Sequence, residues 1–146
     1  MNQRSSKSPE RLYQQALNIQ YGKERGLWLP KMTALALRGH SDAMVDLADW
    51  LAGDDSELGS AAASLSAASL YNRAYRKGNA RAAHNLAMTL FNRNDLFGYR
   101  KWMRKAARAG DDAARLQVAR FEIRLPHAAA RKIGRKRPEH ERDEFA

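Results

Sequence analysis

Apolar residues recur every three or four positions along this chain, and glycines mark the ends of the runs. One arrangement occurs three times: a glycine, an alanine four residues later, an aliphatic residue at eight and an alanine at nine. The three copies are Gly39, Ala43, Leu47, Ala48; Gly78, Ala82, Leu86, Ala87; and Gly110, Ala114, Val118, Ala119. A pattern that recurs at separations of 39 and 32 residues is typical of repeat architectures.

The spacing predicts pairs of helices that reverse at these glycines. A leading helix is expected over 9–21, because Pro9 suits a first helical turn and the apolar stripe ends at Gly22. The expected pairs are 29–38 with a helix capped by Ser41 or Asp42, 60–77 with 80–91, and 96–109 with a helix capped by Asp111 that runs to about 125. A further short helix is expected over 127–133, and a loop over 52–59.

No segment alternates apolar and polar residues over the length of a strand, so the predicted fold class is all-α. Small residues four and nine positions after each glycine would let the two helices of a pair approach closely. The chain is therefore predicted to be an α-solenoid of about three stacked helix-turn-helix repeats, with capping helices at its two ends.

Upstream of each glycine the pattern continues with aromatic, basic and small residues. The segment 101–114, KWMRKAARAGDDAA, resembles the Sel-one-like repeat, a relative of the tetratricopeptide repeat, whose pattern reads Ala-x-x-Trp-Tyr-x-Lys-Ala-Ala-x-x-Gly. The second copy fits through Ala67, Leu70, Tyr71, Arg73, Ala74, Tyr75 and Gly78. The first copy has Lys31 where tryptophan is expected, and the family's glycine-rich linker is absent. The resemblance covers about residues 28–123.

This resemblance implies a right-handed superhelix whose concave face is lined by the first helix of each pair. It implies a non-enzymatic scaffold or adaptor that binds a protein or peptide on that face. Small bacterial proteins that resemble the family are often adaptors or regulators, and some are toxin-immunity proteins. The expected organisation is a disordered N-terminus (1–8), a capping helix and loop (9–26), three repeats (27–125), and a C-terminal cap with a charged tail (126–146).

Composition narrows the class of protein further. The 146 residues include no cysteine, which excludes disulfides and thiolate metal sites. The polar N-terminus has no apolar core of a secretory signal, and no apolar run approaches the roughly 20 residues that span a bilayer. We therefore expect a single-domain cytoplasmic protein without membrane association.

The net charge of +10 is concentrated in one region of the chain. Residues 93–137 hold 14 Lys/Arg against four Asp/Glu. Within it, Arg100, Arg104 and Arg108 recur every four residues, with Lys101 and Lys105 beside them. These five residues are the predicted binding site for a partner with an acidic surface. A solvated basic face explains the same pattern equally well.

Two further expectations depend on which side of this segment is packed. Trp102 and Met103 are predicted to form its packing face. Replacement of Arg100, Arg104 and Arg108 by glutamate is expected to abolish partner capture while helical content stays unchanged.

Nucleic-acid binding through residues 93–137 is the alternative function. The cluster Arg131, Lys132, Arg135, Lys136 and Arg137 would suit phosphates, although an acidic run at 139–144 follows it. Against this reading, Trp102, Phe91 and Phe121 are all expected at core positions, which leaves no exposed ring to stack on bases.

No catalytic or metal-binding constellation is found, so no enzyme activity and no cofactor are predicted. The histidines His40, His84, His127 and His140 are far apart, and a solvated or capping role is expected for the first two. Asp42, Asp46 and Asp49 share a helical face that could hold a cation or a basic segment, but a solvated acidic face is the commoner meaning. No nucleophile motif of the GxSxG type and no phosphate-binding loop is present.

Overall fold

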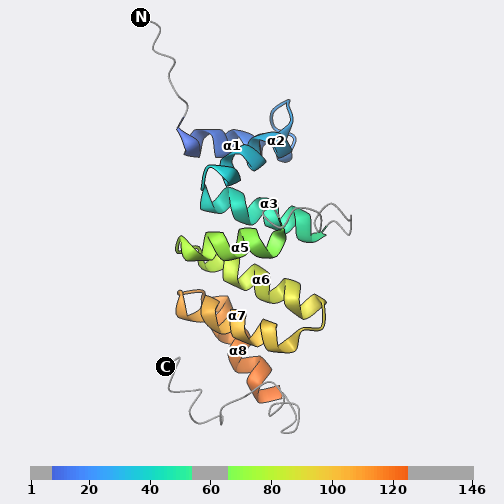
Figure 1. Cartoon of the computed structure of the whole chain (residues 1–146), viewed down its shortest axis with the longest axis vertical. Helices are drawn as coiled ribbons and strands as arrows, with labels where there is room; N and C mark the ends of the chain where they lie inside the picture. The colour runs from blue at the N-terminus through green and yellow to red at the C-terminus, as the bar shows by residue number, and fades with distance from the viewer. Residues whose placement is uncertain (1–7, 54–65, 125–146) are drawn as a thin grey trace, which may run out of the picture. The chain divides into compact units, whose positions relative to one another are not determined.

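The computed structural model describes residues 8–53 and 66–124, and within these ranges the regular structure is entirely α-helical. The helices are α1 (Pro9–Gln20), α2 (Trp28–Leu37), α3 (Ser41–Gly53), α5 (Ala67–Arg76), α6 (Ala80–Asn92), α7 (Leu96–Arg108) and α8 (Asp112–Arg124) (Figure 1). The predicted all-α class is confirmed for this part of the chain.

The chain divides into two compact units, one ending at Lys77 and the other beginning at Gly78. In the first unit α1 packs on α2, α2 on α3, and α3 on α5; in the second, α6 packs on α7 and α7 on α8 (Figure 1). Two of the predicted helix pairs, α2 with α3 and α7 with α8, therefore each lie within one unit. The boundary between the units falls between α5 and α6.

The core of the first unit consists of aliphatic, alanine and methionine side chains with one buried tyrosine. Its largest fully buried side chains are Tyr71, Met32, Met44, Leu70 and Val45. The Tyr71 ring is buried on α5 while its hydroxyl donates to Asp49 Oδ1 of α3 at 2.6 Å. One turn earlier on the same helix, Asp46 Oδ2 accepts the Tyr13 hydroxyl of α1 at 2.5 Å. A buried ring with a bonded hydroxyl combines apolar burial with a satisfied polar group.

The turns after α2 and α7 have the same geometry and explain the repeated glycine. Gly39, Gly78 and Gly110 have φ of +94°, +92° and +101°, a region that side chains rarely adopt. At Gly39 and Gly110, the N–H groups of the glycine and of the next residue donate to carbonyls three and five residues back, at 3.1–3.2 Å. This is the Schellman arrangement, which satisfies carbonyls at the end of a helix.

The residue after each of these glycines caps the next helix. The side chains of His40, Asn79 and Asp111 accept the backbone N–H three residues later at 3.2, 3.4 and 2.9 Å. Those N–H groups belong to the repeated alanines Ala43, Ala82 and Ala114, whose side chains are fully buried. The repeated spacing thus encodes a helix end, a cap and the first buried residue of the next helix.

The predicted cap of α8 by Asp111 is confirmed, but the predicted cap of α3 by Ser41 or Asp42 is wrong. The Nδ1 atom of His40 accepts the Ala43 N–H, and the helix already includes Ser41. Because Nδ1 accepts, the ring proton is on Nε2, which lies 3.3 Å from Glu10 Oε2 on α1. The expected capping role of His40 is confirmed.

A fourth turn of this kind, between α6 and α7, is not apparent from the glycine pattern. Here Asn94 takes the positive φ of 60°, and Asp95 accepts the N–H of Gly98 at 2.8 Å. A Cβ at Gly98 would meet the Asp95 carboxylate that caps α7 and would lie 2.9 Å from Leu90 Cδ1 of α6, so glycine leaves room for both side chains. Asn94 stands where the other turns have glycine, and Gly98 stands where they have alanine. The glycine–alanine pattern therefore does not identify this turn.

The aliphatic positions of the repeat are in the core, as predicted: Leu47, Leu86 and Val118 are each at most 4% exposed. The alanines nine residues after the glycine are buried at Ala48 and Ala87, but Ala119 is exposed. Ala119 lies about 100° around α8 from Val118, and in the described part of the second unit α8 packs mainly on α7. The third copy of the pattern therefore differs from the first two in the burial of its last alanine.

Helix boundaries otherwise agree with the predictions to within one or two residues. Ala52 and Gly53, expected in a loop, complete α3 instead. The helix expected over 60–77 begins at Ala67, because Ser66 is extended and caps α5 by accepting the Ser69 N–H at 3.2 Å, so the predicted start at 60 is wrong. The remainder of the predicted loop, residues 60–65, the short helix over 127–133 and both termini lie outside the described residues.

A pair of glycine substitutions tests the role of the turn. A Cβ would meet nothing within 4 Å at Gly110 or at Gly53, but Gly110 has positive φ and Gly53 is helical. We expect Gly110→Ala to lower the free energy of unfolding by about 1–2 kcal/mol. Gly53→Ala is expected to raise it by up to about 1 kcal/mol, because alanine favours the helix. Denaturant unfolding measures both, and changes of the same sign would contradict the assigned conformations.

Candidate interaction surface on helix α7

Helix α7 is fixed between its two neighbours in the second unit, and only part of its surface remains exposed. Asp95 caps its N-terminus, and its buried positions include Gly98, Tyr99, Met103, Ala106 and Ala107. Because α6 and α8 both pack on α7, the exposed side chains are held on a rigid element. A helix positions side chains more firmly than a loop does.

Three aromatic rings connect the helices of this unit. The ring centroids of Phe91 on α6 and Tyr99 on α7 are 5.2 Å apart, and those of Tyr99 and Phe121 on α8 are 4.8 Å apart. Both pairs are tilted or edge-to-face, the arrangements that aromatic quadrupoles favour. Tyr99 is 5% exposed, and this burial raises the pKa of its phenol. The three rings therefore set the position of α7.

The five predicted binding residues are not equally accessible. Lys101 and Arg108 are exposed, Arg100 and Lys105 are half-buried, and Arg104 is buried with 8% of its surface exposed. Side chains four residues apart are displaced by about 40° around a helix at each step. Exposure therefore varies along the stripe: Arg100 is partly exposed, Arg104 is buried, and Arg108 is exposed.

Lys105 is held in place by a neighbouring ring. Its Nζ atom lies 4.1 Å from the centroid of the Trp102 ring, within the range of a cation–π interaction. Trp102 and Met103 were both predicted to form the packing face of the helix. Met103 is fully buried, as predicted, whereas Trp102 is only half-buried. The tryptophan serves partly as a support for the ammonium group.

Phe97, which the sequence reasoning did not select, completes the exposed side of α7. It is 61% exposed and precedes Lys101 by four residues. Phe97, Lys101, Lys105 and Arg108 follow one another at spacings of four, four and three residues, and we refer to these four residues as the α7 face. Phe97 could have been identified from the sequence, because it lies four residues before Lys101 and therefore on the same side of the helix.

The expectation that the aromatic rings of this region are all in the core is wrong. Phe91 is 44% exposed, Trp102 and Phe121 are half-buried, and Phe97 is largely exposed. Phe91 lies on the last turn of α6, where its ring contacts Tyr99 but stays partly exposed. Phe91 and Phe97 are therefore rings on which a base could stack.

Charge on the second unit favours an anionic partner. Residues 78–124 contain ten Lys/Arg and four Asp/Glu. Two of the carboxylates are engaged in caps, Asp95 at α7 and Asp111 at α8. Asp111 Oδ2 also lies 2.9 Å from His84 Nδ1, which assigns His84 to a structural contact. A third, Asp112, forms an ion pair with Arg115 at 3.4 Å.

The acidic face of α3 takes part in internal contacts. As described above, Asp46 and Asp49 accept hydrogen bonds from tyrosines on α1 and α5. The sequence suggested either a cation site or a solvated acidic face. These two carboxylates instead bind tyrosine hydroxyls within the protein. No group of three or more potential metal ligands occurs in the described ranges.

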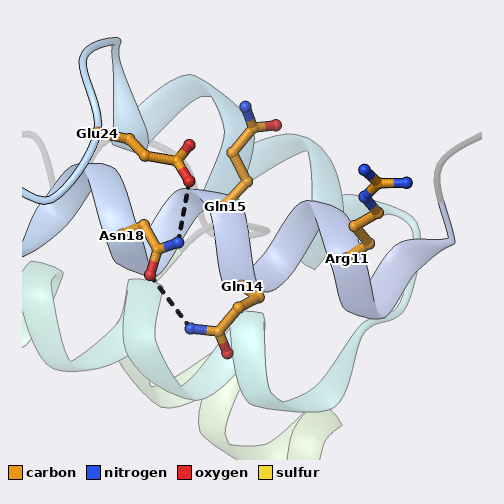
Figure 2. Close-up of a pocket in the computed structure, with 5 residues that line it drawn as sticks. All are labelled: Arg11, Gln14, Gln15, Asn18 and Glu24. Carbon is orange, nitrogen blue, oxygen red and sulfur yellow. Dashed lines mark hydrogen bonds between the residues drawn. The ribbon is translucent and has the colours of Figure 1, made fainter.

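A polar hollow of about 260 Å³ lies on the first unit, along α1 and the turn that follows it. Arg11, Gln14, Gln15, Asn18 and Glu24 line it (Figure 2). Asn18 Nδ2 donates to Glu24 Oε1 at 3.0 Å, and Gln14 Nε2 donates to Asn18 Oδ1 at 3.3 Å, while Arg11 stands apart (Figure 2). Because its polar groups bond mainly to one another at the surface, this hollow is a weaker candidate than the α7 face.

Among the helices that the structure describes, none combines the length and apolar character needed to cross a bilayer. Comparisons with protein-family models, with curated proteins and with solved structures find no match for this chain.

Proposed function

We propose that this protein is an α-helical repeat module that binds an acidic segment of another protein through the α7 face. The observation that carries the proposal is the alignment of Lys101, Lys105 and Arg108 on the exposed side of a helix fixed at both flanks. Exposed cations on a rigid helix can pair with carboxylates, and steer them, without loss of backbone freedom.

The repeat character is part of the same proposal. The turn and cap geometry at Gly39 and Gly110 is what repeated helical hairpins require, and the segment around Gly110 carries the resemblance to the Sel-one-like repeat. We propose that the three glycine-centred copies are three such repeats of an α-solenoid, and that α7 with α8 is the third of them. In this arrangement α7 is the first helix of its pair, and its exposed side belongs to the binding face.

The test uses a fluorescently labelled 20-residue glutamate-rich peptide, with binding followed by fluorescence anisotropy. Exchange of Lys101 and Arg108 for glutamate is expected to weaken binding by about 10–100-fold, because each reversal removes one attraction and adds one repulsion of up to about 1 kcal/mol. The matched control is exchange of Lys23 and Arg25, both exposed on the first unit, for glutamate. Equal loss in the two variants would assign the effect to net charge and contradict the proposal.

Single-stranded nucleic acid is the second candidate partner, because Phe97 is an exposed ring beside two cations. A base can stack on such a ring while the cations contact phosphates. The same titration with a 20-nucleotide single strand discriminates the two functions. Phosphate contacts would give a steep linear fall of log affinity with log salt. If the oligonucleotide binds at physiological salt and the peptide does not, the protein-binding proposal is wrong.

A further inference from the structure

The spacing of the α7 face contains information about the shape of its partner. With a rise of about 1.5 Å per residue, Phe97 precedes Lys101 by about 6 Å, and Lys105 and Arg108 follow Lys101 by about 6 and 10.5 Å. A second helix that lies along α7 offers side chains at the same separations when they are four, four and three residues apart.

Other common modes of peptide recognition suit this surface poorly. Addition of a strand requires a sheet edge, and the described ranges contain no strand. Recognition of a polyproline segment requires a groove lined by several rings, whereas the Trp102 ring has the Lys105 ammonium over it. Of these three modes, a helix suits the surface best.

We infer that the α7 face binds an amphipathic acidic helix, antiparallel to α7, with carboxylates at positions 1, 4 and 8 and an apolar residue at position 12. This inference rests on the proposed protein-binding function and specifies its partner. The three carboxylates lie opposite Arg108, Lys105 and Lys101 in that order, and the apolar residue packs on Phe97. Charge complementarity between the three cations and the three carboxylates selects this occupant.

The antiparallel direction follows from electrostatics. Acidic residues at positions 1 and 4 lie in the first turn of the partner helix, where the helix dipole favours negative charge. The same direction places the positive end of the partner helix beside the negative C-terminal end of α7. The support of Lys105 by Trp102 fixes one of the cations before the partner arrives.

The test compares three 16-residue peptides of equal charge and nearly equal composition, each labelled for fluorescence anisotropy. One has glutamates at 1, 4 and 8 and leucine at 12 in an alanine- and glutamine-rich helix; one has the same residues at 1, 3, 6 and 11; and one has the first pattern with two central prolines. We expect the first to bind about tenfold tighter than the second, equal to about 1.4 kcal/mol, and the third to bind no better than the second. A reversed sequence tests the direction and is expected to bind more weakly.

The apolar contact has its own matched control. Phe97→Ala is expected to weaken the in-register peptide by about tenfold. Leu116→Ala, at a similarly exposed apolar residue on α8 of the same unit, is expected to leave binding unchanged. The melting temperature and helical circular dichroism of both variants establish that the fold is retained.

The outcomes separate this inference from the proposed function. If all three peptides bind equally and the Lys101 and Arg108 exchange still abolishes binding, an acidic partner stands and the helical register is wrong. If neither these peptides nor the glutamate-rich peptide binds, both proposals fail. If only the single-stranded oligonucleotide binds, the partner belongs to the other class of macromolecule and the inference is overturned.

Discussion

Replacement of Tyr99 by alanine is expected to lower the free energy of unfolding by about 3–5 kcal/mol, the range for large aromatic side chains removed from a core. Tyr99 is 5% exposed and contacts Phe91 of α6 and Phe121 of α8. Its removal leaves a cavity and breaks both ring contacts at once, so α7 loses its connection to two neighbours. Denaturant unfolding followed by circular dichroism measures the change.

The control Tyr99→Phe keeps the ring and both contacts, and we expect only a small change near neutral pH. At alkaline pH the two proteins should differ. Burial raises the pKa of Tyr99 above its ordinary 10.0, so the folded protein resists ionisation that the unfolded chain undergoes. The wild type therefore loses stability as the pH rises above about 10, and Tyr99→Phe should lose less. A parallel fall in both proteins would contradict the burial of this phenol.

Exchange of Arg104 for glutamate is expected to destabilise the protein by about 3–5 kcal/mol, comparable to the loss of one partner of a buried ion pair. The side chain is 8% exposed, so the new carboxylate would lose most of its hydration. Attraction to Arg100 and Arg108, one turn away on either side, recovers only about 0.3–0.5 kcal/mol for each pair. The cost of desolvation therefore exceeds this gain.

Lys101→Glu is the matched control for this prediction, because it makes the same change of charge three residues away at an exposed position. Surface substitutions of this kind usually change stability by about 0.5 kcal/mol or less. Thermal and denaturant unfolding of the two variants should differ by several kcal/mol. Equal stabilities would show that Arg104 is exposed in solution.

The burial of Arg104 also changes how the α7 face must be tested. Simultaneous replacement of Arg100, Arg104 and Arg108 is expected from the sequence alone to spare the helical content. Because Arg104 is buried, that variant would combine a loss of binding with a loss of stability. Lys101 and Arg108 are exposed, so their exchange separates the two effects.

Local features of the fold were predictable because their causes lie within a few residues. The ends of α2 and α7 follow from glycines that accept positive φ, and the starts of α6 and α8 from Asn79 and Asp111 as caps. A solvated or capping role was expected for His40, but the start of α3 was assigned to Ser41 or Asp42, because serine and aspartate are commoner caps than a histidine ring. The turn at Asn94 was missed because its residues differ from those at the glycine turns.

The sequence by itself determined where the helices lie and that a basic face exists on α7, because helix periodicity, capping and charge act over short distances. Tertiary structure alone decided which side of α7 meets solvent. In the folded unit Arg104 is buried and Tyr99 is held between the rings of Phe91 and Phe121, while Phe97, Lys101 and Arg108 are exposed. Side chains project from every side of a helix. Only contacts with segments that are distant in the sequence decide which side is packed and which is accessible.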